Sequence, residues 1–216
     1  MHQSVGLHMR GLDLPRRKID IRFLMHVSLW AIAMIIHQVA SGLVSEWGHN
    51  VIHKMPPLPD LGHILMPNLQ QWRWLPEVLI HGPLVFSGIL AIARVDIHGI
   101  EHFLQAHGIS MLIRALSFSM TLLPDASQMC DESKWSGSCH DLIFSGHMVA
   151  LALSSMYLWS KTNKLALKAV VLLNVIAAAV LTIAVRNHYS VDVFLALIIA
   201  PAVSQWLGHT KSFKVL

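Results

Sequence analysis

Charged residues are scarce in this sequence. Asp, Glu, Lys and Arg make up only 13% of the 216 residues, whereas 54% are hydrophobic, and the mean hydropathy is +0.54. Soluble globular domains carry about 25% charged residues, so the composition excludes an ordinary soluble domain. It predicts an integral membrane protein whose length suits one compact domain.

Cysteine is scarce as well, and Cys130 and Cys139 are the only two in the chain. Two cysteines exclude a multi-disulfide framework and a four-cysteine zinc site. An oxidising environment would favour one bridge between them, and two unpaired thiols are the alternative.

The formal charge of +4 does not indicate a nucleic-acid partner. The basic residues fall in short segments between apolar runs, as in membrane proteins. Arg10, Arg16, Arg17 and Lys18 precede the first of these runs. That run is too long for the core of a secretory signal peptide and lacks a small-x-small cleavage site, so we expect a retained first helix.

Six apolar runs have about the length that crosses a bilayer as a helix, roughly 17 to 25 residues. Prolines and polar residues separate them, and the sequence shows no internal repeat or low-complexity linker. The predicted fold is therefore all-α, a six-helix membrane bundle over residues 23–208, with a cytosolic segment at 1–22 and a cytosolic tail at 209–216. The predicted membrane spans are residues 23–44, 77–95, 107–124, 142–159, 169–185 and 191–208.

Lysine and arginine are distributed unevenly between the two sides of this predicted bundle. With the N-terminus inside, eleven of the 16 basic residues lie on the inner side and four on the outer side, and Arg114 falls within the third run. Because cytosolic loops are enriched in Lys and Arg, we expect both termini in the cytosol. The segments 45–76, 125–141 and 186–191 then share the outer face. That face is lumenal or extracellular in a eukaryote, in the Golgi or the plasma membrane, and periplasmic in a bacterium.

Histidines stand at the outer ends of two predicted helices. The stretch SCHDLIFSGHMVA places His147 near the start of the fourth run, and RNHYSVDVF places His188 four residues before Asp192. Residues four apart share a helix face, so Asp192 can accept the Nδ1 proton of His188 and leave Nε2 free as a nucleophile. We expect His147 one or two turns into its helix, roughly 8 Å below the surface, where it can exchange a proton across the site. Ionisable groups at membrane depth are costly and usually functional, so these residues are the predicted catalytic groups of phosphoryl transfer through a phosphohistidine.

The charge on a transferred phosphoryl group must be stabilised by cations or amide dipoles. Arg114 and Arg186 are the candidate cations, and the backbone amides around Ser145 and Gly146 are weaker candidates. For Arg114 the alternative is snorkelling or pairing within the bundle. For Asp141 the alternative is an N-terminal helix cap.

One metal-binding pattern in the sequence is better explained by chance. The stretch HGIEH at 98–102 matches the H-x-x-E-H pattern of a zinc-protease class, and the chain has 15 histidines. The stretch falls in a predicted short inner loop, opposite the other polar clusters and without an evident third ligand. No metal site and no other cofactor is therefore predicted.

Four segments of the chain resemble, in order, the four signatures of the sphingomyelin synthase family. SCHDLIFSGHM, from residue 138, is similar to the third signature, cysteine-glycine-aspartate followed after three residues by serine-glycine-histidine-threonine. HYSVDV, from His188, is similar to the fourth. PPLPD at 56–60 resembles the first, and RALSFSMTLLP from Arg114 resembles the end of the second. The chain departs from these patterns at His140, Met148 and Ser190.

The resemblance implies a ceramide phosphotransferase of the PAP2, or lipid phosphate phosphatase, superfamily, with a PAP2-like helical bundle. It implies the same catalytic residues, His147, His188 and Asp192. The expected reaction moves a phospho-head group, with phosphocholine as the first choice, from a glycerophospholipid to ceramide or another lipid alcohol and releases diacylglycerol. The substrate-binding candidates are Arg114, Asp141, Ser145, Gly146, Tyr189, Arg186 and Asp60.

Other functions remain open at the level of sequence. The transferred head group could instead be inositol phosphate or ethanolamine phosphate, and the acceptor could be diacylglycerol. With water as the acceptor the same residues would make a lipid phosphatase, but the lysine-arginine first motif of that group is absent, which favours a transferase. A membrane scaffold without catalysis is the remaining class. Membrane lipids are the expected partners, and a homo-oligomer is left open.

Overall fold

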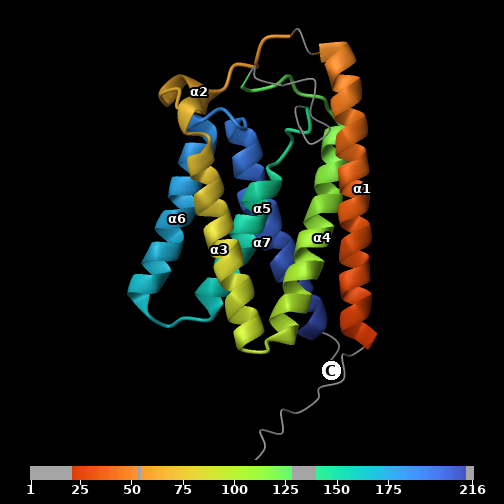
Figure 1. The fold of residues 1–216 in the computed structure, drawn as a ribbon, viewed down its shortest axis with the longest axis vertical. Helices are drawn as coiled ribbons and strands as arrows, with labels where there is room; N and C mark the ends of the chain where they lie inside the picture. Colours follow the sequence, from red (N-terminus) through yellow and green to blue (C-terminus); the bar gives the residue numbers. More distant parts are fainter. Residues whose placement is uncertain (1–20, 53–54, 128–139, 213–216) are drawn as a thin grey trace, which may run out of the picture.

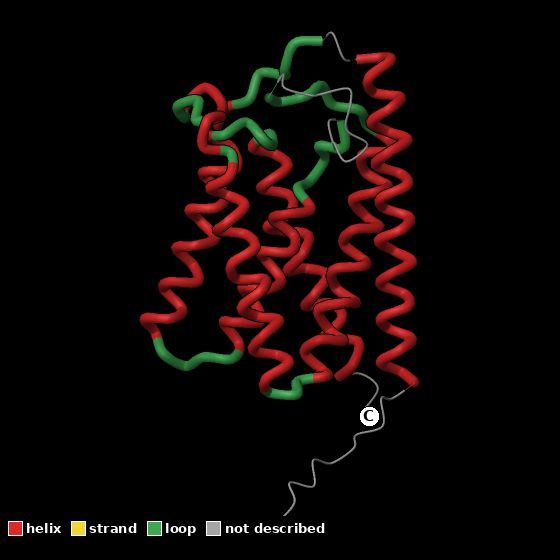
Figure 2. Tube along the Cα trace, viewed as in Figure 1, coloured by secondary structure: helices red, strands yellow, loops and turns green. Residues whose placement is uncertain are grey.

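The regular secondary structure in the described part of the chain is entirely helical. The computed structural model describes residues 21–52, 55–127 and 140–212, and no strand occurs among them (Figures 1 and 2). The helices are α1 (Ile21–Ile52), α2 (Leu61–Leu65), the short 3-10 helix η1 (Gln70–Trp72), α3 (Trp74–Ala93), α4 (Ile97–Met120), α5 (Gly146–Ser160), α6 (Leu165–Ala184) and α7 (Ser190–Ser212).

The six long helices run along a common direction and form one bundle. In Figure 1, α1 lies at one edge and α6 at the other, with α5 and α7 between them. Helix α1 packs on α4, and α5 contacts α3, α4, α6 and α7. The turns after α3 and α5 lie at one end, whereas α2 and the segments 121–127 and 140–145 lie at the other. The described parts of the segments assigned to the outer face therefore share one end of the bundle.

Helix α5 occupies the centre because its side chains are small or apolar on every side between Met148 and Ser155, where every residue is buried. Met148, Val149 and Leu151 are fully buried, and they pack with residues of α3, α6 and α7 in the main hydrophobic cluster. The surrounding helices carry large apolar side chains on their outer surfaces, for example Leu43 of α1 and Leu173 of α6, each 63% exposed. Contiguous exposed apolar surface of this kind indicates contact with a membrane or a partner.

Four of the described helices are long and apolar enough to cross a membrane: α1, α3 with η1, α6 and α7. Helices α4 and α5 coincide with the two remaining predicted spans but differ in character. Helix α5 has only 15 residues, and α4 buries the charged residues Glu101 and Arg114. The prediction of six spans thus stays a prediction for these two helices.

Several helix boundaries differ from the sequence prediction. Helix α1 continues to Ile52, eight residues into the predicted outer loop, and α4 begins at Ile97, ten residues earlier than predicted. The early start has a local cause, because the carboxylate of Asp96 accepts the Gly99 N–H at 3.0 Å and caps the helix. The stretch HGIEH is therefore helical, and the prediction that it forms a short loop was wrong.

Candidate active site

The segment before α5 enters the bundle in a strained conformation. Phe144 has a positive φ of 46°, which is rare for a bulky residue, and its side chain is fully buried. Arg114 of α4 donates from Nε to the Phe144 carbonyl at 2.7 Å and from Nη2 to the Asp141 carbonyl at 2.6 Å. The Ser145 N–H donates to the Asp192 carbonyl of α7 at 3.1 Å. Helices α4 and α7 thus hold the segment from two sides.

His147 follows directly after this segment. The Ser145 hydroxyl accepts the Met148 N–H at 3.3 Å and caps α5, so His147 is the second residue of the helix. The prediction that it lies one or two turns into the helix was wrong, because residues 140–145 are not helical. The start of α5 still lies below that end of the bundle, since the segment 140–145 runs inward before the helix begins (Figure 1).

The turn between α6 and α7 presents His188. Its residue surface is 8% exposed, and Nδ1 lies 3.4 Å from Oδ2 of Asp192, longer than the usual 2.7 to 3.2 Å of an N–H···O hydrogen bond. The same Oδ2 accepts the Tyr189 N–H at 3.0 Å, and Asp192 is fully buried. A fixed carboxylate therefore faces Nδ1, although His188 lies in the turn before α7 and not on the shared helix face from which the spacing predicted this contact.

A cavity of about 270 Å³ is lined by both histidines. Its walls come from α1, α3, α4, α5 and the turn before α7. The predicted site residues that line it are His147, His188, Arg114, Asp141 and Gly146. The structure thus brings together the two predicted catalytic histidines, with Asp192 behind one of them.

Arg114 is fully engaged within the bundle. Besides its two bonds to backbone carbonyls, Nη1 lies 3.0 Å from Oδ2 of Asp141 and contacts Nε2 of His37. The Ser41 hydroxyl donates to the same Asp141 oxygen at 2.8 Å. Of the two sequence alternatives for Arg114, pairing within the bundle describes its contacts. Asp141 is not a helix cap, since Ser145 has that position.

Glu77 and His81 are site residues that sequence reasoning missed. Both belong to α3 and lie beside His147: Oε2 of Glu77 lies 3.7 Å from Nε2 of His147, and the His81 and His147 rings meet edge to face with their centroids 6.0 Å apart. His81 also lines the cavity. Their spacing of four residues was the available signal, the same one that singled out His188 and Asp192. It was overlooked because no signature covers the start of α3.

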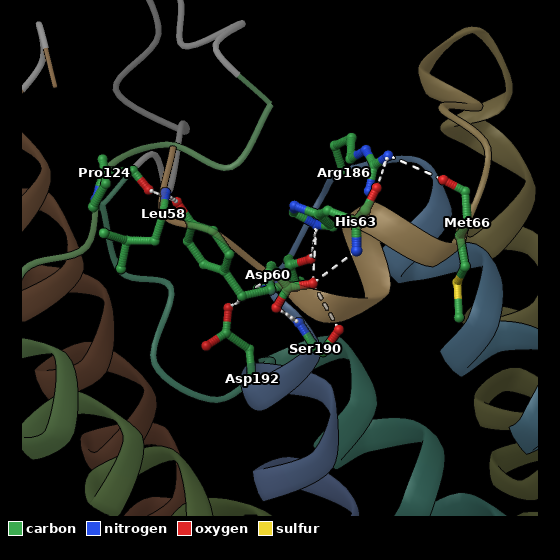
Figure 3. Close-up of polar contacts among 10 residues, drawn as sticks. Leu58, Asp60, His63, Met66, Pro124, Arg186, Ser190 and Asp192 are labelled. Carbon is green, nitrogen blue, oxygen red and sulfur yellow. Dashed lines mark hydrogen bonds and ion pairs between the residues drawn. The ribbon is translucent and has the colours of Figure 1, made fainter. Parts of the chain in front are cut away.

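Three other substrate-binding candidates belong to a separate hydrogen-bond network, at the end of the bundle where α2 lies (Figure 3). Asp60 accepts the Ser190 N–H at 2.8 Å and the Ser190 hydroxyl at 2.7 Å, and it also accepts the His63 N–H at 2.9 Å. Burial raises the pKa of Asp60, but these hydrogen bonds outweigh it and hold the pKa below its ordinary value. Asp60 therefore fixes the start of α2 and the start of α7 at once.

Arg186 and Tyr189 extend this network. Arg186, whose φ is 62°, donates from Nη2 to the carbonyls of His63 at 2.7 Å and Met66 at 3.2 Å. The Tyr189 hydroxyl donates to the Pro124 carbonyl at 2.9 Å and accepts the Leu58 N–H at 3.0 Å (Figure 3). Burial raises the pKa of Tyr189, so the hydroxyl keeps its proton. Asp60, Arg186 and Tyr189 do not line the cavity of the two histidines, and Ser145 is fully buried as a cap. Cys130 and Cys139 lie outside the described residues.

Comparison with known proteins agrees with this geometry. Residues 138–210 match the family model described as PAP2 superfamily C-terminal, a stretch that includes the predicted catalytic residues. A phosphatidylinositol:ceramide inositolphosphotransferase 2 of Arabidopsis thaliana is 27% identical over 211 aligned residues, covering 77% of this chain and 65% of the relative. Phosphatidylinositol:ceramide inositolphosphotransferases of Oryza sativa subsp. indica and subsp. japonica are each 24% identical over 209, covering 82% of this chain and 64% of the relative.

The alignments span just under two thirds of the length of these curated relatives. The family match over residues 138–210 contains the segment that Arg114 and α7 hold in place, together with both histidines. Residues 138–210 thus form a PAP2 superfamily C-terminal domain, and the chain is homologous to the plant phosphatidylinositol:ceramide inositolphosphotransferases.

Proposed function

We propose that this chain is a ceramide phosphotransferase that moves inositol phosphate from phosphatidylinositol to ceramide and releases diacylglycerol. The observation that carries the proposal is the shared cavity: His147 of α5 and His188 of the turn before α7 both line it, and a buried carboxylate lies behind His188. The names of the relatives favour inositol phosphate over phosphocholine, which was the first choice from sequence, and so support the alternative stated there.

The first half of the reaction forms a phosphohistidine. Nε2 of His188 attacks the phosphorus of the donor lipid while Asp192 holds the Nδ1 proton and the orientation of the ring. His147, protonated at the start, gives its proton to the departing diacylglycerol oxygen as the bond from phosphorus to that oxygen breaks. The head group is then bound to His188 as a phosphoramidate.

The second half returns the enzyme to its starting state. Neutral His147 takes the proton of the ceramide primary hydroxyl, and the resulting oxygen attacks phosphorus as the phosphorus–nitrogen bond breaks. One phosphodiester replaces another, so the exchange needs no nucleotide. The Glu77 carboxylate, 3.7 Å from His147 Nε2, stabilises the protonated form of His147 that the first half requires.

The charge on the phosphoryl oxygens falls near the start of α5. Gly146 lines the cavity, and the first amides of a helix carry partial positive charge. Arg114 also lines the cavity, but its guanidinium bonds are occupied by the 141–144 segment. In the proposed reaction the positive charge of Arg114 stabilises the phosphoryl oxygens electrostatically, and backbone amides at the start of α5 donate the hydrogen bonds to them.

The proposed setting is a membrane with all six long helices spanning it and the cavity near the outer face. The cavity wall from α1 and the wall from α3 belong to helices that each expose large apolar side chains, such as Ile35 and Ile89. Donor and acceptor lipids then reach the histidines from the outer leaflet, with their acyl chains remaining in hydrocarbon.

A product assay tests this function. The purified full chain in lipid nanodiscs receives ceramide with an equimolar mixture of phosphatidylinositol, phosphatidylcholine and phosphatidylethanolamine, and mass spectrometry identifies the sphingolipids formed. We expect inositol phosphorylceramide and diacylglycerol in equal amounts. His188→Ala should form none, and His98→Ala, a change at a side chain 98% exposed at the other end of α4, should behave as wild type. Sphingomyelin as the main product would refute the donor, and release of phosphate or a phosphate monoester without any sphingophospholipid would refute the transferase.

A further inference from the structure

Helices α3 and α5 bring together three side chains with the chemistry of a metal site. Glu77, His81 and His147 each offer one ligand atom, and these atoms lie within 4.8 Å of one another. They are the only group of its kind among the described residues. His81 and His147 also line the cavity, and the side chains of Glu77, His81 and His147 are 38%, 54% and 50% exposed.

The distances between these ligand atoms are close to those around a tetrahedrally coordinated metal ion. Ligand atoms about 2.05 Å from a tetrahedral Zn²⁺ lie roughly 3.3 Å apart. Oε2 of Glu77 lies 3.5 Å from Nδ1 of His81 and 3.7 Å from Nε2 of His147. Two of the three ligand pairs are thus within a few tenths of an ångström of the required distance, and a small rotation of exposed side chains closes the difference.

The ligand types select the ion. Two imidazoles and one carboxylate suit Zn²⁺ and related transition metals, whereas Mg²⁺ and Ca²⁺ prefer oxygen ligands. Two ligands are held on one helix: Glu77 and His81 are four residues apart, and Nδ1 of His81 lies 2.9 Å from the Glu77 carbonyl. Ligation by Nδ1 exchanges that hydrogen bond for a metal bond. Three protein ligands leave a fourth position for water or a lipid phosphate oxygen.

We propose that Glu77, His81 and His147 form a Zn²⁺ site that switches the active site off. The consequence for activity rests on the proposed function, in which His147 carries the transferred proton. A metal bound to Nε2 occupies the lone pair that must accept this proton, so the metal and the reaction compete for one nitrogen atom. The three side chains are partly exposed near the start of α3 and the start of α5, which face outward in the proposed topology, so external Zn²⁺ reaches them there.

A binding measurement tests the site without reference to catalysis. The full chain, purified with a tag that contains no histidine and treated with chelator, is titrated with ZnCl₂ by calorimetry, and Co²⁺ is used as a spectroscopic probe of tetrahedral ligation. We expect one tight site per chain. His81→Asn and Glu77→Gln should each weaken it by at least about tenfold, since even the loss of an outer partner of a metal ligand costs 10–100-fold. His98→Asn, at an exposed histidine of α4, is the matched control and should leave the affinity unchanged.

An activity measurement then tests the switch. Head-group transfer is measured over a series of free Zn²⁺ concentrations, and each variant is compared with its own rate in the presence of chelator. The wild type should lose its activity as the tight site fills, and His81→Asn should need at least about tenfold more Zn²⁺ for the same loss. Equal affinity in wild type and His81→Asn would overturn the site, and full turnover with the tight site occupied would overturn the switch. A chain that binds Zn²⁺ through His81 but never transfers a head group would refute the proposed function and support the site alone.

Discussion

Replacing Arg114 with methionine should strongly destabilise the protein, because Arg114 neutralises a buried charge and supports a strained segment. Arg114 is 4% exposed and makes two hydrogen bonds to carbonyls of the 141–144 segment, in addition to its ion pair with Asp141 at 3.0 Å. After the change, the Ser41 hydroxyl would be the one remaining partner of the Asp141 carboxylate among the residues that the structure describes.

The size of the effect follows from that uncompensated charge. Removing one partner of a buried ion pair typically costs about 3–5 kcal/mol, against a total stability of about 5–15 kcal/mol for most proteins. Methionine keeps much of the side-chain volume, so the loss reports the charge and the hydrogen bonds more than a cavity. Adding Asp141→Asn to the Arg114→Met chain removes the charge, and the double variant should recover about 0.5–3 kcal/mol relative to the sum of the single changes.

The assay is unfolding in mixed micelles titrated with SDS and followed by the fluorescence of the seven tryptophans. Arg94→Met is the matched control, since Arg94 is an exposed residue at the end of α3, and it should change the free energy of unfolding by less than about 0.5 kcal/mol. An unchanged unfolding midpoint for Arg114→Met, combined with a raised KM for the donor lipid, would refute the structural role and restore the phosphate contact that the sequence left open.

The remaining predictions concern His188 and Asp192, the hydrogen bonds of Asp60, and the orientation of the chain in the membrane. His188→Ala should abolish head-group transfer, whereas Asp192→Asn should leave a measurable remainder, because it disturbs the tautomer and orientation and keeps the nucleophile; wild-type transfer by His188→Ala would end the covalent mechanism. Asp60, whose pKa is held below its ordinary value of 3.8, should stabilise the fold fully above that pH and lose its contribution as the pH falls through the lower folded-state pKa. Unfolding measured from pH 6 to pH 3 should therefore show a steeper acid loss in wild type than in Asp60→Asn, and parallel curves would contradict this. A single cysteine at Ser190 should react with an impermeant thiol reagent added outside sealed vesicles and one at Thr162 should not, in a background without Cys130 and Cys139; the opposite labelling would reverse the orientation.

The helix bundle could be predicted from sequence because runs of apolar residues of membrane length leave few alternatives to helix. The boundaries could not, since they depend on single caps. Ser145 and Asp96 each end a non-helical segment by accepting one N–H. Ser145 lies inside an apolar run whose composition does not mark the boundary, and Asp96 precedes a polar stretch that is helical all the same.

The proximity of His188 and Asp192 could be predicted from their spacing of four residues, although His188 lies in the turn before α7 and not on the helix itself. The roles of Arg114, Asp60 and Arg186 were not predictable, because their partners are backbone carbonyls and amides of segments far away in the sequence. A sequence motif identifies such residues as important but does not distinguish a ligand contact from a hydrogen bond that holds a loop.

Asp60 joins two segments of the bundle that are far apart in the sequence. One carboxylate holds the first turn of α2 and the first residue of α7, and α7 begins two residues after His188. His63, in the same short helix, also lies 3.1 Å from the His188 carbonyl. Local unfolding of α2 and the start of α7 therefore also releases the turn that presents His188. The amides of His63 and Ser190 should exchange hydrogen with solvent at a common rate, as one cooperative unit that spans about 130 residues of sequence.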